Sequence, residues 1–224
     1  MHHIPVVFTR ASGYDERMVA ASPTAGSSSD RTRDSIVSAA RTAFAAEGYA
    51  EVSLERIATD AGVTKGAIYH HFSNKQDLFI AALEDVEEEV QQRVRRASRG
   101  QRTPLDRLKV GFAAYLDAVL DPEIGRISVV DGPSVIGADQ YKRLSKKYAH
   151  DDVVFTLGVG MPDADEAEIE ALSSILLGAV MHAALILVSS ESPVAAREDM
   201  GVALNRMLDG VLSHPGQTSD PDRK

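Results

Sequence analysis

The segment 53–72 restricts the fold more than any other part of the sequence. Ser53 and Thr64 are each placed to cap a helix. Apolar residues follow helical spacing after each cap: Leu54, Ile57, Ala58 and Ala61 in the first segment, Ile68 and Phe72 in the second. Gly62, between the two segments, tolerates the positive φ that a tight turn requires. The pattern predicts a helix-turn-helix, a motif whose second helix enters the major groove of DNA.

The second helix of this motif leaves polar and small residues on its outer face. Lys65 can donate hydrogen bonds to guanine O6 and N7, or to phosphate alone. Gly66 and Ala67 permit close approach, and the Ala67 methyl group can contact a thymine methyl group. Tyr69 and His70 are candidate phosphate donors. The alternative for each position is a helix face that is merely solvated.

Two flanking motifs extend this pattern: Ala-Phe-Ala-Ala-Glu-Gly-Tyr at residues 43–49 and Asn-Lys-Gln-Asp-Leu-Phe at residues 74–79. Together with segment 53–72, they make residues 33–83 resemble the TetR/AcrR family of regulators. Beyond residue 100 the resemblance lies in the overall layout. It implies a C-terminal helical domain that binds a small ligand and dimerises.

The resemblance also implies which residues contact DNA. The positions that match the family's recognition helix are Lys65, Gly66, Ala67, Tyr69, His70 and His71. Thr64 would begin that helix, and Lys75 matches a phosphate-contacting lysine at the start of the fourth helix. Independently of the family, a backbone N–H near Ser53, at the start of the first helix of the motif, can bind phosphate.

The whole chain is expected to be all-α, because no run of alternating strand pattern occurs in it. We expect the chain to divide into four segments. The two end segments, 1–29 and 214–224, should be disordered, because small and polar residues bury little apolar surface. Between these ends lie a helix-turn-helix domain at 30–80 and a helical ligand-binding and dimerisation domain at 81–213. Either Met1 or Met18 could be the natural start, and the first segment lacks the pattern of a signal peptide.

Helix boundaries can also be predicted. The first helix should run from about Thr32 to Glu47 and stop at Gly48. A capping box of Ser73 and Gln76 should open a long fourth helix, acidic in its first half and basic in its second, as the helix dipole favours. Breaks are expected at two places further along, Asp121-Pro122 and Asp131-Gly132-Pro133, with a helix containing Tyr141, Tyr148 and Phe155 after the second.

Charge and composition limit the classes of function. The net charge of −9 argues against DNA binding, and residues 30–80 still carry six Lys or Arg against seven Asp or Glu. DNA contact must therefore depend on where a few groups are placed. Without cysteine the chain has no disulfide or thiolate metal site, and a cytoplasmic location is expected. Adjacent His70 and His71 point about 100° apart on a helix, so they are poor joint ligands and we expect no metal. The sequence has no nucleophile elbow, phosphate loop or metal-ligand cluster, so we expect no cofactor and no enzyme activity.

The apolar stretch Ala171–Val188 is long enough to span a membrane. Ser173, Ser174, His182 and the flanking acidic residues weigh against a span. A helix that is apolar nearly all round can instead be buried on two sides, here by its own domain and by a partner subunit. Residues 194–212 repeat apolar residues in near-heptad spacing. This pattern predicts that the last two helices form a homodimer interface. A two-fold dimer would bind a palindromic DNA operator.

Several residues of the C-terminal domain could line a ligand pocket: Phe112, Tyr115, Tyr148, Phe155, Met181 and His182. Each could equally be plain core, and His182 could also pair across a dimer. Apolar walls would favour a small hydrophobic or aromatic ligand. The sequence thus predicts a ligand-responsive homodimeric repressor. The alternative is a helical ligand-binding or protein-interaction module that does not bind DNA.

Overall fold

The computed structural model of the chain describes residues 28–213, which are helical apart from short connections and contain no strand. The expectation of an all-α fold is confirmed for this part of the chain. The predictions for 1–27 and 214–224 lie outside the described residues. The helices are α1 (Ser28–Glu47), α2 (Leu54–Asp60), α3 (Lys65–His71), α4 (Lys75–Ser98), α5 (Pro104–Ala118), α6 (Pro122–Ile124), the π-helix η1 (Gly125–Asp131), α7 (Gly132–Ser145), the π-helix η2 (Lys146–His150), α8 (Asp151–Gly160), α9 (Glu166–Ser189) and α10 (Pro193–Ser213).

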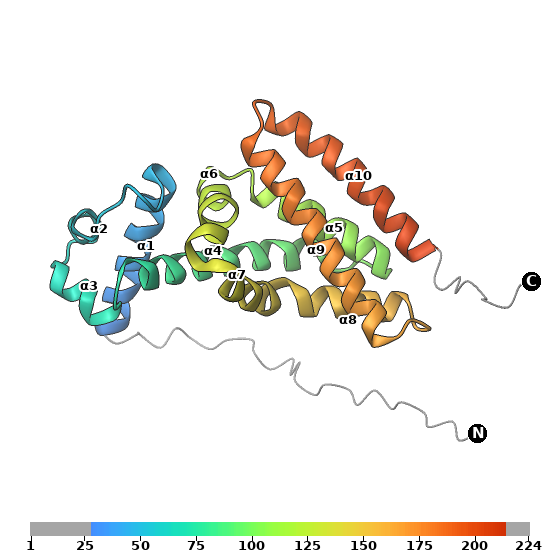
Figure 1. Cartoon of the computed structure of the whole chain (residues 1–224), viewed down its shortest axis with the longest axis horizontal. Helices are drawn as coiled ribbons and strands as arrows, with labels where there is room; N and C mark the ends of the chain where they lie inside the picture. Colours follow the sequence, from blue (N-terminus) through green and yellow to red (C-terminus); the bar gives the residue numbers. More distant parts are fainter. Residues whose placement is uncertain (1–27, 214–224) are drawn as a thin grey trace, which may run out of the picture.

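Helices α1, α2 and α3 form a small head at one end of the molecule (Figure 1). Its core is closed by large side chains that are fully buried: Ile36, Phe44, Ile57, Ile68 and Phe79. The rings of Phe44 and Phe79 meet edge to face, with centroids 5.2 Å apart, which joins α1 to the start of α4. Gly48 and Gly62 have φ of 82° and 67°, so both predicted helix stops are confirmed.

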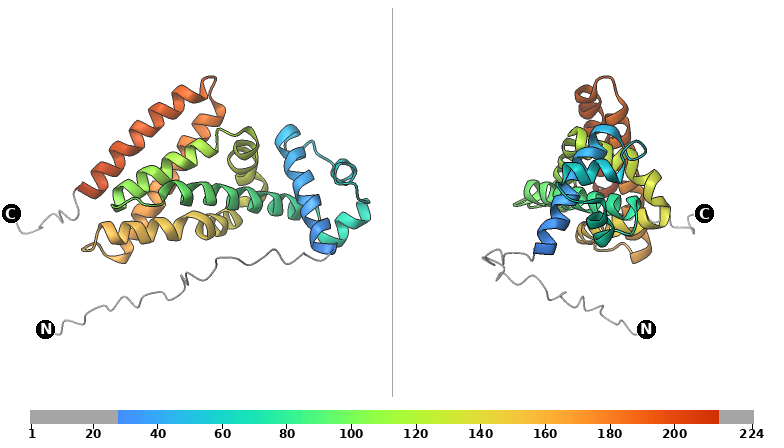
Figure 2. Two further views of the ribbon diagram at one scale, coloured as in Figure 1. Left: turned by 180° about the vertical axis from the view of Figure 1, so that it is seen from behind. Right: turned by 90° about the vertical axis from the view of Figure 1, so that its left-hand side faces the viewer.

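Helix α4 runs from the head into the body of the molecule and packs along α5 (Figure 2). The predicted capping box at its start is wrong. Asn74 rather than Ser73 is the N-cap, and its side chain accepts a hydrogen bond from the Asp77 N–H at 2.8 Å. The helix begins one residue later than expected, so Gln76 cannot reach back to the cap. Its amide instead donates to the Val135 carbonyl, 2.6 Å away.

The break predicted at Asp131-Gly132-Pro133 is also wrong. Gly132 keeps helical angles (φ −48°, ψ −60°), and η1 continues directly into α7. Pro133 stands in the first turn of α7 and does not interrupt the path of the helix. The chain departs from helical geometry at Gly137 instead, with φ of 75° and ψ of 166°. The break at Asp121-Pro122 is confirmed, because Asp121 is extended and caps α6.

Helices α9 and α10 form a hairpin against α5 (Figure 1). Residues Glu166–Ser189 have the length and apolarity of a membrane span, but such a helix is weak evidence, and α9 packs against α5, α8 and α10. Leu176, Ala184 and Leu187 are buried on its inner side. The outer sides of the hairpin carry exposed apolar residues: Ile175, Ile186, Val194 and Val202. Large apolar side chains therefore face outward on both helices.

Candidate functional sites

Helix α3 presents a polar face away from the head. The Thr64 hydroxyl caps it by accepting a hydrogen bond from the Ala67 N–H at 3.2 Å, as predicted. Ile68 is fully buried and Phe72 nearly so, which fixes the rotation of the helix. On the other side, Lys65, Gly66 and His70 are exposed, and Tyr69 is 51% exposed despite its large ring. Ala67 and His71 are half-buried. An anchored helix with a free polar face has the form needed to enter a DNA groove.

Lys65 forms an ion pair with Glu55 of α2 and lies 5.8 Å from the centre of the Tyr69 ring. The hydrogen bond with Glu55 raises the pKa of Lys65, and the same bond lowers the pKa of Glu55. Both side chains are solvent-exposed, so this pair is weak and can be exchanged for a phosphate or base contact.

Ser53, Lys65, Tyr69 and Lys75 line one hollow on the surface of the head. Ser53 caps α2 by accepting a hydrogen bond from the Arg56 N–H at 3.2 Å. The Lys75 ammonium lies 4.5 Å from the centre of the Tyr49 ring and donates to the Ala50 carbonyl at 3.1 Å. The structure thus brings four of the predicted DNA-contacting residues together. Gly66, Ala67, His70 and His71 lie elsewhere on α3, and within residues 28–213 no group of three acidic or histidine side chains is placed to hold a metal.

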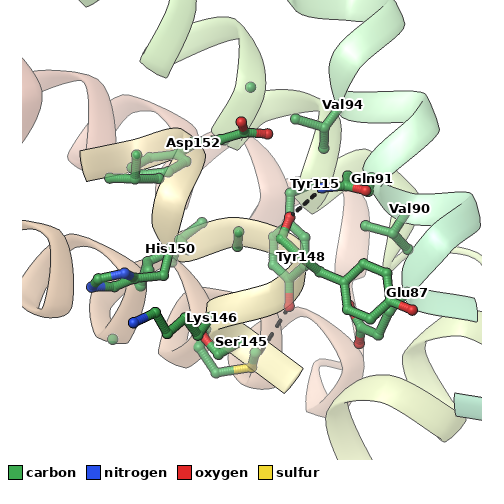
Figure 3. Close-up of a pocket in the computed structure, with 18 of the residues that line it drawn as sticks. Glu87, Val90, Gln91, Val94, Tyr115, Ser145, Lys146, Tyr148, His150 and Asp152 are labelled. Carbon is green, nitrogen blue, oxygen red and sulfur yellow. Dashed lines mark hydrogen bonds between the residues drawn. The ribbon is translucent and has the colours of Figure 1, made fainter. Parts of the chain in front are cut away.

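A cavity of about 880 Å³ lies in the body between α4, α5, α7, η2, α8 and α9 (Figure 3). Five of the six predicted pocket residues line it: Phe112, Tyr115, Tyr148, Met181 and His182. Phe155 does not line it, and its side chain is 66% exposed. Phe155 occupies a helical position of α8 that faces away from the core. His182 is exposed at the cavity lining, so it is not a buried core histidine in the single chain.

A few polar contacts order the cavity wall. The Tyr115 hydroxyl donates to the Met181 sulfur at 3.6 Å, and the Gln91 amide donates to the Tyr148 carbonyl at 3.0 Å (Figure 3). Ser128 of η1 donates a hydrogen bond to the Glu87 carboxylate. Glu87 is therefore a carboxyl group among mainly apolar and aromatic neighbours.

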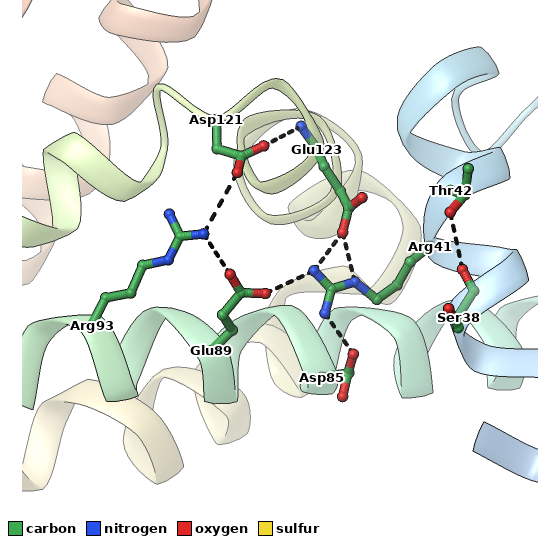
Figure 4. A network of polar contacts seen from close by, with 8 residues as sticks. All are labelled: Ser38, Arg41, Thr42, Asp85, Glu89, Arg93, Asp121 and Glu123. Carbon is green, nitrogen blue, oxygen red and sulfur yellow. Dashed lines mark hydrogen bonds and ion pairs between the residues drawn. The ribbon is translucent and has the colours of Figure 1, made fainter. Parts of the chain in front are cut away.

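The head and the body are joined by the Arg41 cluster, which we define as Arg41 of α1 with Asp85, Glu89 and Glu123 (Figure 4). The guanidinium of Arg41 contacts Asp85 at 2.6 Å and Glu89 at 2.9 Å, both on α4. It also pairs with Glu123 of α6. A single cation thus connects α1 to both α4 and α6.

Two family models cover most of the described chain. The model described as bacterial regulatory proteins of the tetR family matches residues 36–82, and the tetracyclin repressor-like C-terminal domain matches residues 105–211. The chain belongs to the TetR family. It is a transcriptional regulator with a DNA-binding head and not an enzyme.

Individual TetR-family relatives agree with this assignment. The Transposon Tn10 TetC protein of Escherichia coli is 29% identical over 160 residues, which are 69% of this chain and 79% of TetC. The regulator TtgR of Pseudomonas putida is 39% identical over 102 residues, which are 44% of this chain and 48% of TtgR. The chain therefore matches about half the length of TtgR.

Solved structures of TetR-family regulators match over nearly their whole length. A TetR-family transcriptional regulator from Pectobacterium atrosepticum has a TM-score of 0.69 and 29% identity, covering 84% of this chain and 97% of its own. RolR in complex with resorcinol has a TM-score of 0.63 at 16% identity, covering 84% of this chain and 95% of RolR, and this likeness shows the fold alone.

Sequence reasoning missed Glu87 and the Arg41 cluster of this TetR-family chain. Glu87 belongs to the acidic first half of α4, a pattern that the helix dipole alone would explain. However, it follows Leu83 by four residues and precedes Val90 by three, so it lies on the apolar stripe of the helix. A carboxyl group on such a stripe is the signal that could have identified it. No comparable signal exists for Arg41, because its partners come from two distant segments.

Proposed function

We propose that this regulator is a cytoplasmic, homodimeric repressor that binds a palindromic operator through α3 and responds to a small ligand. The observation that carries the proposal is the orientation of α3. Ile68 and Phe72 anchor one face in the head, while Lys65, Gly66, Tyr69 and His70 lie on the opposite, exposed face. Lys75 and Ser53 border the same surface, where they can contact phosphates that flank the groove.

Dimerisation is supported by the outer faces of α9 and α10. Ile175 and Val194 are 62% and 70% exposed in the single chain, and Ile186 and Val202 also face solvent. Burying such side chains is favourable by about 25 cal/mol for each Å² of apolar surface. A two-fold pairing of the α9–α10 hairpin would bring four helices together. It would also supply two copies of α3, which a palindromic site requires.

Communication between the cavity and the head can run through α4. Helix α4 contributes Glu87 and Gln91 to the cavity and Asp85 and Glu89 to the Arg41 cluster. A ligand that shifts α4 would therefore move the ion pairs that hold α1. Such a ligand changes operator affinity only if it binds the two arrangements with different affinity. The distance between the two copies of α3 is the quantity that the operator would sense.

The alternative is a ligand-binding module that does not bind DNA. The observation that favours it is the charge of the head, where seven acidic residues oppose six basic ones and Glu55 pairs with Lys65. Selection of genomic fragments by the purified protein, followed by fluorescence anisotropy across a salt series, separates the two. Specific binding that weakens as salt rises supports the regulator. Absence of binding at every salt concentration supports the module.

A further inference from the structure

The carboxyl group of Glu87 lines the cavity from α4 and has a single hydrogen-bond partner in the described chain, the hydroxyl of Ser128. Only one carboxylate oxygen takes part in that bond, and Glu87 forms no ion pair with any residue between 28 and 213. Its neighbours along the helix stripe, Leu83 and Val90, are buried and apolar. Glu87 is half-buried, and an ionised carboxylate that is partly removed from water and has no cation beside it is costly. A cation is therefore the partner that would stabilise the charged form of Glu87.

Two tyrosine side chains from other helices line the same cavity as this carboxyl group. Burial, and to a lesser extent the negative charge of Glu87, raises the pKa of Tyr115 of α5 and raises the pKa of Tyr141 of α7 to about 12. Both side chains line the cavity. The face of a phenol ring attracts a cation, and the attraction increases where water is excluded. The cavity therefore combines a carboxylate and aromatic faces around one space.

Basic side chains also line the cavity, but they differ from Glu87 in their surroundings. Arg107, Lys142 and Lys146 are exposed to solvent, which screens their charge. Arg95 is paired at 3.6 Å with Asp152. These cations can be solvated, whereas Glu87 lies among apolar side chains.

We propose that the ligand of this cavity is an amphiphilic amine: an apolar or aromatic body that fills the cavity and a protonated nitrogen that pairs with Glu87. The inference rests on the proposed function, whose ligand-responsive part it makes specific. An ammonium group would donate hydrogen bonds to the free carboxylate oxygen and lie against the Tyr115 and Tyr141 rings. It would supply the positive charge that Glu87 does not receive from any residue between 28 and 213. A hydrocarbon alone would leave that carboxyl group unpaired.

The test is a titration of the full-length protein, without DNA, with three probes of the same shape: naphthylethylamine, naphthylethanol and naphthylacetate. The chain contains no tryptophan, so naphthyl fluorescence can be followed without indole emission. Calorimetry provides a second readout. We expect the amine to bind about tenfold or more tightly than the alcohol, and the carboxylate to bind most weakly.

Glu87→Gln keeps the shape of the side chain and removes its charge. This variant should weaken amine binding about tenfold or more and change alcohol binding by less than about threefold. Glu88→Gln is the matched control, because Glu88 is the next residue, is exposed and does not line the cavity. It should leave all three affinities unchanged. Thermal melts of both variants show whether the fold is retained.

Equal affinity for the amine and the alcohol would overturn the inference, and so would an amine affinity that Glu87→Gln leaves unchanged. Failure of the amine to bind at millimolar concentration would also overturn it. Amine binding that depends on Glu87, in a protein that binds no DNA, would contradict the proposed regulator and support the inference. Specific DNA binding without a preference for the amine would support the proposed regulator and contradict the inference about the ligand.

Discussion

Arg41 of α1 donates a hydrogen bond from Nε to the Glu123 carboxylate of α6, with the two atoms 2.7 Å apart. This contact joins residues 82 positions apart in the chain and links the DNA-binding head to the body. The Arg41 side chain is only 17% exposed, and two further carboxylates, Asp85 and Glu89, share its guanidinium (Figure 4). The geometry makes Arg41 the common partner of three acidic groups that would otherwise repel each other.

Replacing Arg41 with alanine should lower the stability of the protein, because three neighbouring carboxylates lose their shared cation. For this partly exposed cluster we expect a loss of about 1–3 kcal/mol, or roughly 2–4 °C in Tm for each kcal/mol. Arg96→Ala is the matched control, because Arg96 is exposed on the same helix as Asp85. Equal melting temperatures for the two variants would contradict the structural role of the cluster.

The same variant should change the pH dependence of stability. The hydrogen bond from Arg41 lowers the pKa of Glu89 in the folded protein. A lowered pKa contributes stability above the unfolded pKa, and this contribution is lost as the pH falls through the folded value. The difference in Tm between wild type and Arg41→Ala should therefore be largest near neutral pH and shrink in acid. A difference that grows in acid would contradict this account.

Lys65→Ala should weaken operator binding by roughly tenfold or more, because a cation on the outer face of α3 is lost. Tyr69→Phe removes only a hydroxyl group and should have a smaller effect in the same direction. Arg102→Ala, an exposed change of the same charge in the connection between α4 and α5, is the control. Anisotropy titrations with the selected fragment measure all three. If Lys65→Ala and Arg102→Ala bound the DNA fragment equally well, α3 would not be the recognition helix.

Glu87→Gln should stabilise the ligand-free protein at alkaline pH. Burial raises the pKa of Glu87, and the bond from Ser128 only partly opposes this. A raised pKa means that folding favours the protonated carboxyl, so stability falls as the pH rises through the folded value. The variant cannot ionise and avoids this loss. Its Tm should exceed that of wild type at pH 8, and the gap should narrow toward pH 5.

The Glu88→Gln control separates this pH dependence from that of the other titratable groups near Glu87. Tyr115 of α5 and Tyr141 of α7 have raised pKa values and remain protonated across this range. His150 of η2 also lines the cavity, with its Nε2 3.0 Å from Glu170. Glu88→Gln retains all of these groups, so its difference from wild type should not vary with pH. If the Tm difference between Glu88→Gln and wild type varied with pH in the same way, the effect would come from a group other than Glu87.

Gly62→Ala should destabilise the head by about 1 kcal/mol, because φ is 67° at this turn and a Cβ is disfavoured there. The cost is conformational, since an added Cβ would meet no atom within 4 Å. Gly62→Asn should cost less, because asparagine adopts positive φ more readily. Urea unfolding of the two variants measures the difference. If the alanine and asparagine variants were equally stable, the loss of stability would not come from the backbone conformation at residue 62.

The sequence predicted best where local rules decide the structure. The caps Ser53 and Thr64 and the helix stops Gly48 and Gly62 depend on neighbours within a few residues, and all four are confirmed. The break expected at Gly132 is absent, because η1 continues directly into α7 and Gly132 keeps helical angles.

The site residues divide in the same way. Helical spacing predicted that Lys65 and Tyr69 face outward from α3, where the structure has them exposed. Five of the six residues proposed for a ligand pocket line the cavity. Spacing alone did not show that Phe155 turns outward, because α8 has apolar residues on more than one side. Arg41 and Glu87 acquire their roles from segments distant in sequence, Glu123 and Ser128 respectively. Such contacts become visible only in three dimensions.

The most direct test of the account is the mass of the complex between wild-type protein and its selected DNA fragment, measured by analytical ultracentrifugation. The account predicts two chains on each palindromic duplex, joined through the exposed apolar faces of α9 and α10. A single chain bound specifically to the fragment, or a protein that binds no fragment at all, would contradict it.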